Sequence, residues 1–157
     1  MSGRPDMGGD SLERVLDRCR EQGMRRTRAL EGILAILIRS GTPLTYQSLA
    51  DAMKALCDRA TVYRLLVRLE EKGLVRRLGF HQRSSHYALR FPDRHDDYLI
   101  CTECGSIGTL DLGCPVEAME LEVSRRSGYR KLYHELEFFG VCPSCSAAPP
   151  IASSNSI

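Results

Sequence analysis

Residues 95–105 read His-Asp-Asp-Tyr-Leu-Ile-Cys-Thr-Glu-Cys-Gly and contain Cys101 and Cys104, the first of two Cys-X-X-Cys pairs in this sequence. The second pair, Cys142 and Cys145, follows near the end of the chain. Two such pairs can supply four thiolates to one tetrahedral zinc ion, with every coordination position filled by protein. Disulfides and a redox-active pair are the alternatives, but two pairs together favour one structural zinc (Zn2+) per chain.

The composition of the chain excludes several classes of protein. Its 157 residues make one domain or two small ones, and 43% of them are hydrophobic, which is enough for a packed core. No apolar run reaches the length of about eighteen residues that a membrane span needs. The first ten residues lack the apolar segment of a signal peptide, so we expect a cytoplasmic protein with no membrane partner.

Three cysteines lie outside the two pairs: Cys19, Cys57 and Cys114. In a chain that is not exported, cysteines stay reduced and paired ones bind metal. A free cysteine behaves as a small hydrophobic residue, so we expect each of the three to be an ordinary buried side chain.

Charge divides the chain into two halves of opposite sign. Residues 1–90 carry 17 Lys and Arg against 10 Asp and Glu, a net charge of +7. Residues 91–157 carry 5 Lys and Arg against 10 Asp and Glu, a net charge of −5. A basic half suits a polyanionic partner and an acidic half suits cations, although chance variation in surface charge is the simpler alternative.

The spacing of apolar residues predicts four helices and then a hairpin in the first half. The expected helices are 11–21 with Ser11 as N-cap, the stretch between Thr27 and Gly41, 46–56 after Thr45, and 59–72 after Asp58. Two short strands, 74–80 and 84–90, follow. This order is that of a winged helix, in which the last helix before the hairpin reads DNA.

The helix over 59–72 has the two faces that a recognition helix needs. Val62 and Leu66 fall on its apolar stripe, whereas Arg64 lies on the opposite face with Tyr63 on its flank. Such a helix can enter a major groove. A solvated amphipathic helix has the same pattern, so the hairpin that follows supplies the argument for DNA binding.

Residues 60–64, Ala-Thr-Val-Tyr-Arg, followed by Leu69 and by Gly-Leu-Val at 73–75, closely resemble the recognition helix and wing of the ferric uptake regulator (Fur) family. The two cysteine pairs and the run from His95 to Asp97 belong to the same pattern. The resemblance covers about residues 11–146. It implies a metal-dependent dimeric repressor, not an enzyme, with an N-terminal winged helix and a C-terminal α/β dimerisation domain.

The expected fold class is therefore α+β, with a winged-helix DNA-binding domain at 1–91. A metal-binding dimerisation domain with the four-cysteine zinc site is expected at 92–146, and a disordered tail at 147–157. Pro92 begins the second domain and suits a hinge. Within this domain we expect strands at 98–101, 106–110 and 131–141, and a helix at 116–126.

Five residues of the first domain are candidates for DNA contact, and the resemblance points to three of them, Arg25, Tyr63 and Arg64. The five are Arg25, Arg59, Thr61, Tyr63 and Arg64. Family members send the residue matching Arg25 into the minor groove and use those matching Tyr63 and Arg64 on bases or backbone. The chain departs from the family at one helix start. Members usually have an Arg three residues after the Thr that matches Thr27, and here that position is Leu30.

The resemblance also groups four residues of the second domain into a regulatory metal site: His95, Asp97, Glu117 and His134. His95 and Asp97 are two residues apart, so they point the same way in an extended strand. Two imidazoles and two carboxylates suit Fe2+ or Zn2+, with Mn2+ as a further candidate. Taken singly, His134 has the simpler interpretation of a core histidine, and Glu117 that of a favourable charge at a helix start.

The family's other sensing site is absent in its usual form. Its usual ligands are a His, a Glu and two more His, and the matching residues here are Pro43, Ala88, Asp96 and Tyr98. A substitute made of His81, His86 and Asp96 is a weaker hypothesis, because no spacing rule requires these three residues to converge.

These patterns predict a homodimeric repressor that binds a duplex DNA operator, takes no small-molecule substrate and responds to iron or zinc. One alternative is a zinc-ribbon interaction module, which explains the cysteines but not residues 60–64. The other is a metalloenzyme that uses the regulatory residues. It would need a substrate cleft and a positioned acid or base, which the sequence does not indicate.

Overall fold

The computed structural model describes residues 9–79, 85–91, 96–110, 114 and 116–147, with the backbone alone for 9–11. The chain divides into two units, Met1–His95 and Asp96–Ile157. Pro92 and the residues beyond 147 lie outside the described ranges, so the hinge and the disordered tail stay predictions. Within those ranges, no helix is long and apolar enough to cross a membrane.

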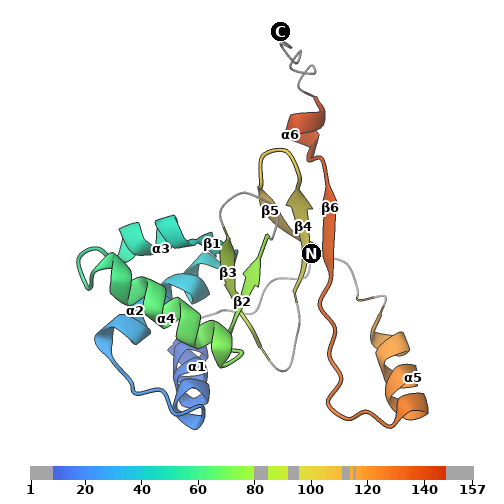
Figure 1. Ribbon diagram of the computed structural model, residues 1–157, viewed down its shortest axis with the longest axis horizontal. Coiled ribbons are helices and arrows are strands. Elements are labelled where there is room, and N and C mark those ends of the chain that lie inside the picture. The colour runs from blue at the N-terminus through green and yellow to red at the C-terminus, as the bar shows by residue number, and fades with distance from the viewer. Residues whose placement is uncertain (1–8, 80–84, 92–95, 111–113, 115, 148–157) are drawn as a thin grey trace, which may run out of the picture. The chain divides into compact units, whose positions relative to one another are not determined.

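Four helices belong to the first unit (Figure 1): α1 Gly9–Glu21, α2 Arg28–Ser40, α3 Tyr46–Met53 and α4 Arg59–Glu71. Side chains cap three of their starts. Thr27, Thr45 and Asp58 each accept a hydrogen bond from the backbone N–H three residues later. The caps at Thr45 and Asp58 were predicted. The prediction of Ser11 as a cap is wrong, because α1 begins two residues earlier and Ser11 lies inside its first turn.

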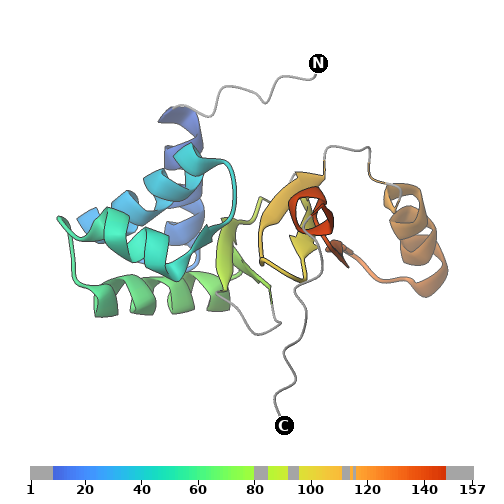
Figure 2. The same cartoon turned by 90° about the horizontal axis from the view of Figure 1, so that it is seen from above.

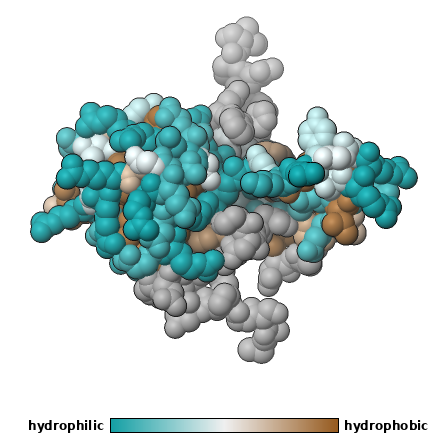
Figure 3. All heavy atoms as spheres, turned by 90° about the horizontal axis from the view of Figure 1, so that it is seen from below, coloured by the Kyte–Doolittle hydropathy of each residue, from teal (hydrophilic) through white to brown (hydrophobic). Residues whose placement is uncertain are grey.

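The helices enclose an aliphatic core, and the predicted apolar stripes supply it. α2 buries Leu30, Ile33, Leu34 and Leu37, α3 buries Leu49 and Met53, and α4 buries Val62, Leu66 and Leu69. Each such side chain contributes about 1.5–3 kcal/mol of transfer free energy. This packing fixes which face of α4 points outward. Figure 3 shows that the surface over the first unit is mostly hydrophilic on the side drawn there.

A three-stranded antiparallel sheet, with strand order β1-β3-β2, completes the first unit beside the helices (Figures 1 and 2). β2 Val75–Leu78 and β3 His86–Leu89 are the two predicted strands, shorter than expected, and residues 80–84 lie outside the described ranges. β1 Leu44–Thr45 was not predicted. It pairs with Tyr87 and His86 just before α3 begins, and it therefore ties the helices to the hairpin.

The second unit contains another three-stranded sheet, of order β5-β4-β6. β4 Asp97–Cys101 pairs antiparallel with β5 Ile107–Leu110 and parallel with β6 Glu137–Gly140. Two helices accompany it, α5 Glu117–Ser127 and the short α6 Pro143–Ser146. The prediction of a strand over 131–141 is wrong in its first half. β6 extends only as far as β4 offers partners, and Lys131 has a positive φ of 56°.

Large apolar side chains remain exposed in the second unit. Leu99 on β4 is 46% exposed, and its register partner Phe138 on β6 is 44% exposed. α5 has no buried residue, and Figures 1 and 2 both draw it to one side of the sheet. A single copy of this unit therefore leaves apolar surface that a monomeric protein would normally bury.

Candidate metal centre and nucleic-acid interface

The second sheet brings the two cysteine pairs together. Cys101 is the last residue of β4, and Cys104 follows in a turn that Gly105 completes with a φ of 73°. Parallel pairing places Cys101 opposite Gly140, so the chain leaving β6 reaches Cys142 beside the first pair. Cys142 caps α6 and Cys145 lies within that helix. Strand pairing thus joins cysteines that are about forty residues apart in the sequence.

The geometry of the four sulfurs fits one tetrahedral ion. All four Sγ atoms lie within 4.8 Å of one another. The Cys104 and Cys142 sulfurs are 3.8 Å apart, and a tetrahedron with Zn–S bonds of about 2.3 Å has edges of about 3.8 Å. A disulfide would bring two sulfurs to about 2.05 Å, and all seven cysteines are free.

Hydrogen bonds make the four thiols unequal. Backbone N–H groups of Cys104 and Cys142 lower the pKa of Cys101 to about 6. The hydroxyl of Ser106, 3.2 Å from the Cys104 sulfur, lowers the pKa of that thiol. The Cys142 thiol raises the pKa of Cys145 to about 12. Cys145 therefore keeps its proton to a higher pH than Cys101, and a cation that binds all four sulfurs would displace the protons that remain.

Of the four predicted regulatory residues, the three that the structure describes do not form a group whose potential ligand atoms all lie within 4.8 Å of one another. His95 lies outside the described residues. Asp97 is buried at the start of β4, whereas Glu117 is exposed at the start of α5. His134 lies in the irregular stretch before β6, not in a strand. Among the described residues, the four cysteines are the one group of three or more potential ligands whose atoms all lie within 4.8 Å of one another.

His134 instead contacts two residues that the sequence did not single out as ligands. Its Nδ1 lies 2.5 Å from Oε2 of Glu120, and its Nε2 lies 3.0 Å from Sγ of Cys114. Glu120 is one helical turn after Glu117, so spacing alone could not choose between them. Of the three unpaired cysteines, Cys19 is buried as predicted, but Cys57 and Cys114 are only half-buried.

The outward face of α4 carries the side chains predicted to contact DNA. Tyr63 is 57% exposed, and Arg64 is exposed while its Nη2 donates to Oγ1 of Thr61 at 3.2 Å. Arg59 instead reaches α3, where it donates to Gln47 at 2.9 Å and to Asp51 at 2.8 Å. Two of these exposed groups, the Tyr63 phenol and the Arg64 guanidinium, can therefore reach a ligand without breaking an ion pair.

A model of the ferric uptake regulator family matches residues 21–139, more than half of the chain. The chain belongs to this family. The ferric uptake regulation protein of Neisseria meningitidis is 33% identical over 88 residues, which are 56% of this chain and 60% of that protein. The peroxide operon regulator of Bacillus subtilis is 31% identical over 147 residues, 89% of this chain and 97% of that regulator.

Solved structures of the Fur family have the same fold. The Helicobacter pylori ferric uptake regulator superposes with a TM-score of 0.67 at 22% identity, covering 94% of this chain and 99% of that one. This likeness confirms the predicted α+β fold, a winged helix followed by an α/β unit with a four-cysteine cluster. The family match ends at residue 139, before Cys142, so the geometry itself joins the second cysteine pair to the first.

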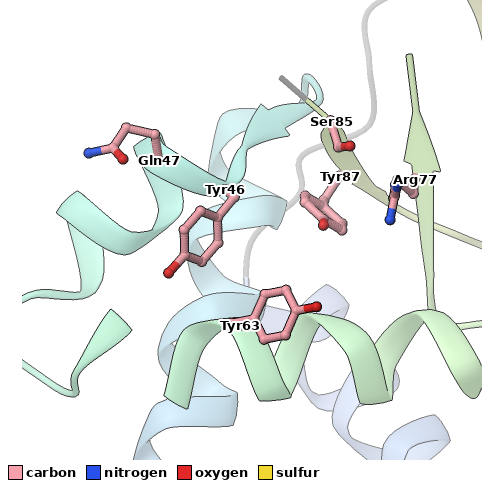
Figure 4. A pocket seen from close by; sticks show the side chains of 6 residues that line it. All are labelled: Tyr46, Gln47, Tyr63, Arg77, Ser85 and Tyr87. Carbon is pink, nitrogen blue, oxygen red and sulfur yellow. The ribbon is translucent and has the colours of Figure 1, made fainter. Parts of the chain in front are cut away.

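In this Fur family member, a hollow of about 450 Å³ lies between α4 and the first sheet. Figure 4 shows Tyr46, Tyr63 and Tyr87 around it, with Arg77 from β2 beside Tyr87. The hydroxyl of Tyr46 is turned away from Arg77 and donates to the backbone carbonyl of Arg59 at 3.0 Å. The Tyr46 and Tyr63 rings meet edge to face with centroids 6.2 Å apart. Their contact fixes the angle at which Tyr63 leaves α4.

The remaining predicted residues occupy separate places in the first unit. Arg25 is exposed before α2. His86 lies in β3 opposite Thr45 and Leu78, and its Nδ1 is buried without a hydrogen-bond partner in the described part of the chain. Because His81 lies outside the described residues, the substitute sensing site with His86 and Asp96 stays a prediction.

Proposed function

We propose that this chain is a metal-responsive transcriptional repressor that binds duplex DNA as a homodimer. One observation supports this most directly: α4 is buried along one side and presents Tyr63 and Arg64 to solvent next to a β-hairpin. A helix held in this way can enter the major groove while the hairpin contacts phosphates. The bound metal, rather than a reaction, would be the signal.

DNA contact would come mainly from Tyr63 and Arg64, with Arg25 reaching the minor groove. Thr61 orients Arg64 through their hydrogen bond. Arg59 would serve more as a tie between α4 and α3, since Gln47 and Asp51 already hold its guanidinium. Such a division leaves two side chains for base or phosphate recognition on each α4 helix.

The four cysteines would hold a structural zinc. With no open coordination position, that ion would supply folding energy and no catalysis. It would join the turn after β4 to the segment after β6, and it would therefore fix the edge of the second sheet.

A second, exchangeable cation would act as the signal, held by His134 with His95, Asp97 and Glu117 as candidate ligands. Asp97 is the one buried charged residue among those described, and a carboxylate oxygen at that place is a suitable ligand for a divalent cation. Binding must favour the DNA-competent state by about 1–3 kcal/mol to act as a switch. Fe2+ and Zn2+ are the first candidates, and Mn2+ is the third.

The dimer would cover the apolar surface of the second unit. Leu99 and Phe138 lie side by side on one face of the sheet, and both are exposed in the single chain. A second copy of the same chain would bury this face symmetrically. Two α4 helices would then address two half-sites of an operator.

A fluorescence-anisotropy titration of labelled duplex DNA tests this function. We expect affinity to rise when Fe2+ or Zn2+ is added to the zinc-containing protein, and to fall with increasing salt. The variant His134→Ala should keep its structural zinc but lose the response to added metal. Salt-independent binding, or no binding with either metal, would favour a zinc-ribbon interaction module instead.

A further inference from the structure

A pair of potential metal ligands, Cys114 and His134, lies outside the four-cysteine cluster, with Glu120 beside the histidine. The two ring nitrogens of this histidine have different neighbours, Glu120 Oε2 at 2.5 Å from Nδ1 and Cys114 Sγ at 3.0 Å from Nε2. The side chains of His134 and Glu120 are 15% and 27% exposed, and Cys114 is half-buried. A thiol, an imidazole and a carboxylate are therefore in contact in a partly buried position outside the four-cysteine cluster.

The contact with Glu120 assigns roles to the two nitrogens. A carboxylate beside Nδ1 favours a proton on that nitrogen, which leaves the lone pair on Nε2. That lone pair is directed at the Cys114 sulfur. Histidines that ligate metals usually have this arrangement, with a carboxylate behind the ring and the metal in front.

The Cys114 sulfur is placed to join Nε2 in holding an ion. The backbone N–H of Val116 donates to this sulfur from 3.4 Å. In a tetrahedral site with bonds of about 2.05 Å to nitrogen and about 2.3 Å to sulfur, the two ligand atoms are about 3.6 Å apart. The observed 3.0 Å would have to widen by only about 0.6 Å to admit the ion.

We propose that Cys114 is a thiolate ligand of the exchangeable metal, together with Nε2 of His134, and that Glu120 positions the histidine. This proposal rests on the proposed function and specifies its sensing site. On binding, the thiol proton leaves to solvent and the cation takes its place between sulfur and nitrogen. A sulfur ligand makes the site softer than one of imidazoles and carboxylates, so it favours Zn2+ or Co2+ over Mn2+.

Cobalt spectroscopy of the full-length protein tests the ligand. The four-cysteine site is first filled with one equivalent of zinc, and Co2+ is then titrated as the second metal. We expect a sulfur-to-cobalt charge-transfer band in the near ultraviolet to grow with this second equivalent. Cys114→Ser should abolish the band and weaken cobalt binding, while Cys57→Ser, which changes another half-buried cysteine, should leave both unchanged.

The role of Glu120 has a separate readout. Glu120→Gln should lower the cobalt affinity by about 10–100-fold and keep the charge-transfer band, because the sulfur ligand remains. An unchanged affinity in this variant would overturn the positioning role of Glu120.

Failure of this proposal is distinguishable from failure of the proposed function. If wild-type protein responds to metal in the DNA titration but shows no sulfur band, Cys114 is not a ligand and only this proposal is overturned. A charge-transfer band that persists in Cys114→Ser would likewise show that Cys114 is not a ligand. If neither metal-dependent DNA binding nor a second bound cobalt is found, the proposed function is overturned as well.

Discussion

At the scale of single residues, hydrogen bonds give the cysteine thiols of the four-cysteine cluster different pKa values. Hydrogen bonds lower the pKa of Cys101 to about 6, while the neighbouring Cys142 thiol raises that of Cys145 to about 12. The Cys101 thiol therefore loses its proton at a lower pH than the Cys145 thiol. Four ligands for zinc require all protons to leave, so zinc binding should weaken as the pH falls.

Replacing Cys104 by Ser should remove the structural zinc. The remaining three sulfurs leave a coordination position open, and the binding energy of such a site is also folding energy. We expect the loss of about one zinc per chain, measured by elemental analysis, and a lower midpoint of thermal unfolding. Cys57→Ser serves as the matched control and should retain zinc. A Cys104→Ser protein with full zinc and unchanged stability would contradict the assignment.

The proposed DNA contact of Arg64 can be tested by measuring operator affinity. Its guanidinium is exposed on α4 and held by Thr61 at 3.2 Å. If it reads a base, Arg64→Ala should weaken operator binding by about 1–3 kcal/mol and leave the zinc content unchanged. Arg20→Ala is a suitable control, because Arg20 is an exposed arginine of α1 paired with Asp17. Anisotropy with wild-type affinity in Arg64→Ala would refute the contact.

At the scale of helices and strands, helix starts could be predicted from nearby residues, whereas strand lengths could not, because they depend on pairing with distant strands. The starts of α2, α3 and α4 follow from Thr27, Thr45 and Asp58, because a capping side chain acts within three residues. The extent of β6 depends on β4, which is distant in sequence, so the predicted strand over 131–141 was too long. β1 was missed for the same reason, since two residues carry no periodicity.

Of the two candidate metal sites, one could be predicted from local spacing and the other could not. The four-cysteine cluster was predictable, because two residues between paired cysteines bring both sulfurs to one ion. The neighbours of His134 were not, because Glu117 and Glu120 lie one turn apart on the same helix and Cys114 has no motif around it. The grouping of His134 with Asp97 and Glu117 came from the family resemblance. The contacts of His134 with Glu120 and Cys114 depend on tertiary structure, and sequence spacing does not reveal them.

The cap of α2 gives a prediction at this scale. Oγ1 of Thr27 accepts from the backbone N–H of Leu30 at 3.1 Å, at a helix that supplies much of the core. Thr27→Ala should lower the free energy of unfolding by about 1 kcal/mol, as measured by urea denaturation. Thr27→Ser keeps the oxygen and should lose much less. Equal stability of the alanine and serine variants would show that the cap contributes nothing.

At the scale of the whole molecule, the two units differ in how complete they are. The first unit buries the apolar faces of its helices in a core of its own. The second leaves Leu99 and Phe138 on the sheet and Met119 and Leu121 on α5 largely exposed. Surface of this kind on one unit only indicates where a partner binds, and point symmetry makes a second copy of the chain the simplest partner.

Lysines on that sheet face should therefore separate the dimer. In Leu99→Lys with Phe138→Lys, two neighbouring apolar side chains become charges within the proposed interface, so association loses apolar burial and must bury charge. Light scattering coupled to size exclusion should give the mass of one chain instead of two. Leu56→Lys, at a leucine of the first unit that is 51% exposed, should remain dimeric.

The same double variant links assembly to DNA binding. A dimer holds two α4 helices on one operator, so its second contact is intramolecular and adds affinity that a single winged helix lacks. The monomeric variant should keep its structural zinc, because the four cysteines all come from one chain. It should bind operator far more weakly than Leu56→Lys at every metal concentration. If it binds as tightly as wild type while monomeric, a single chain is the functional unit, and the apolar face serves a different partner.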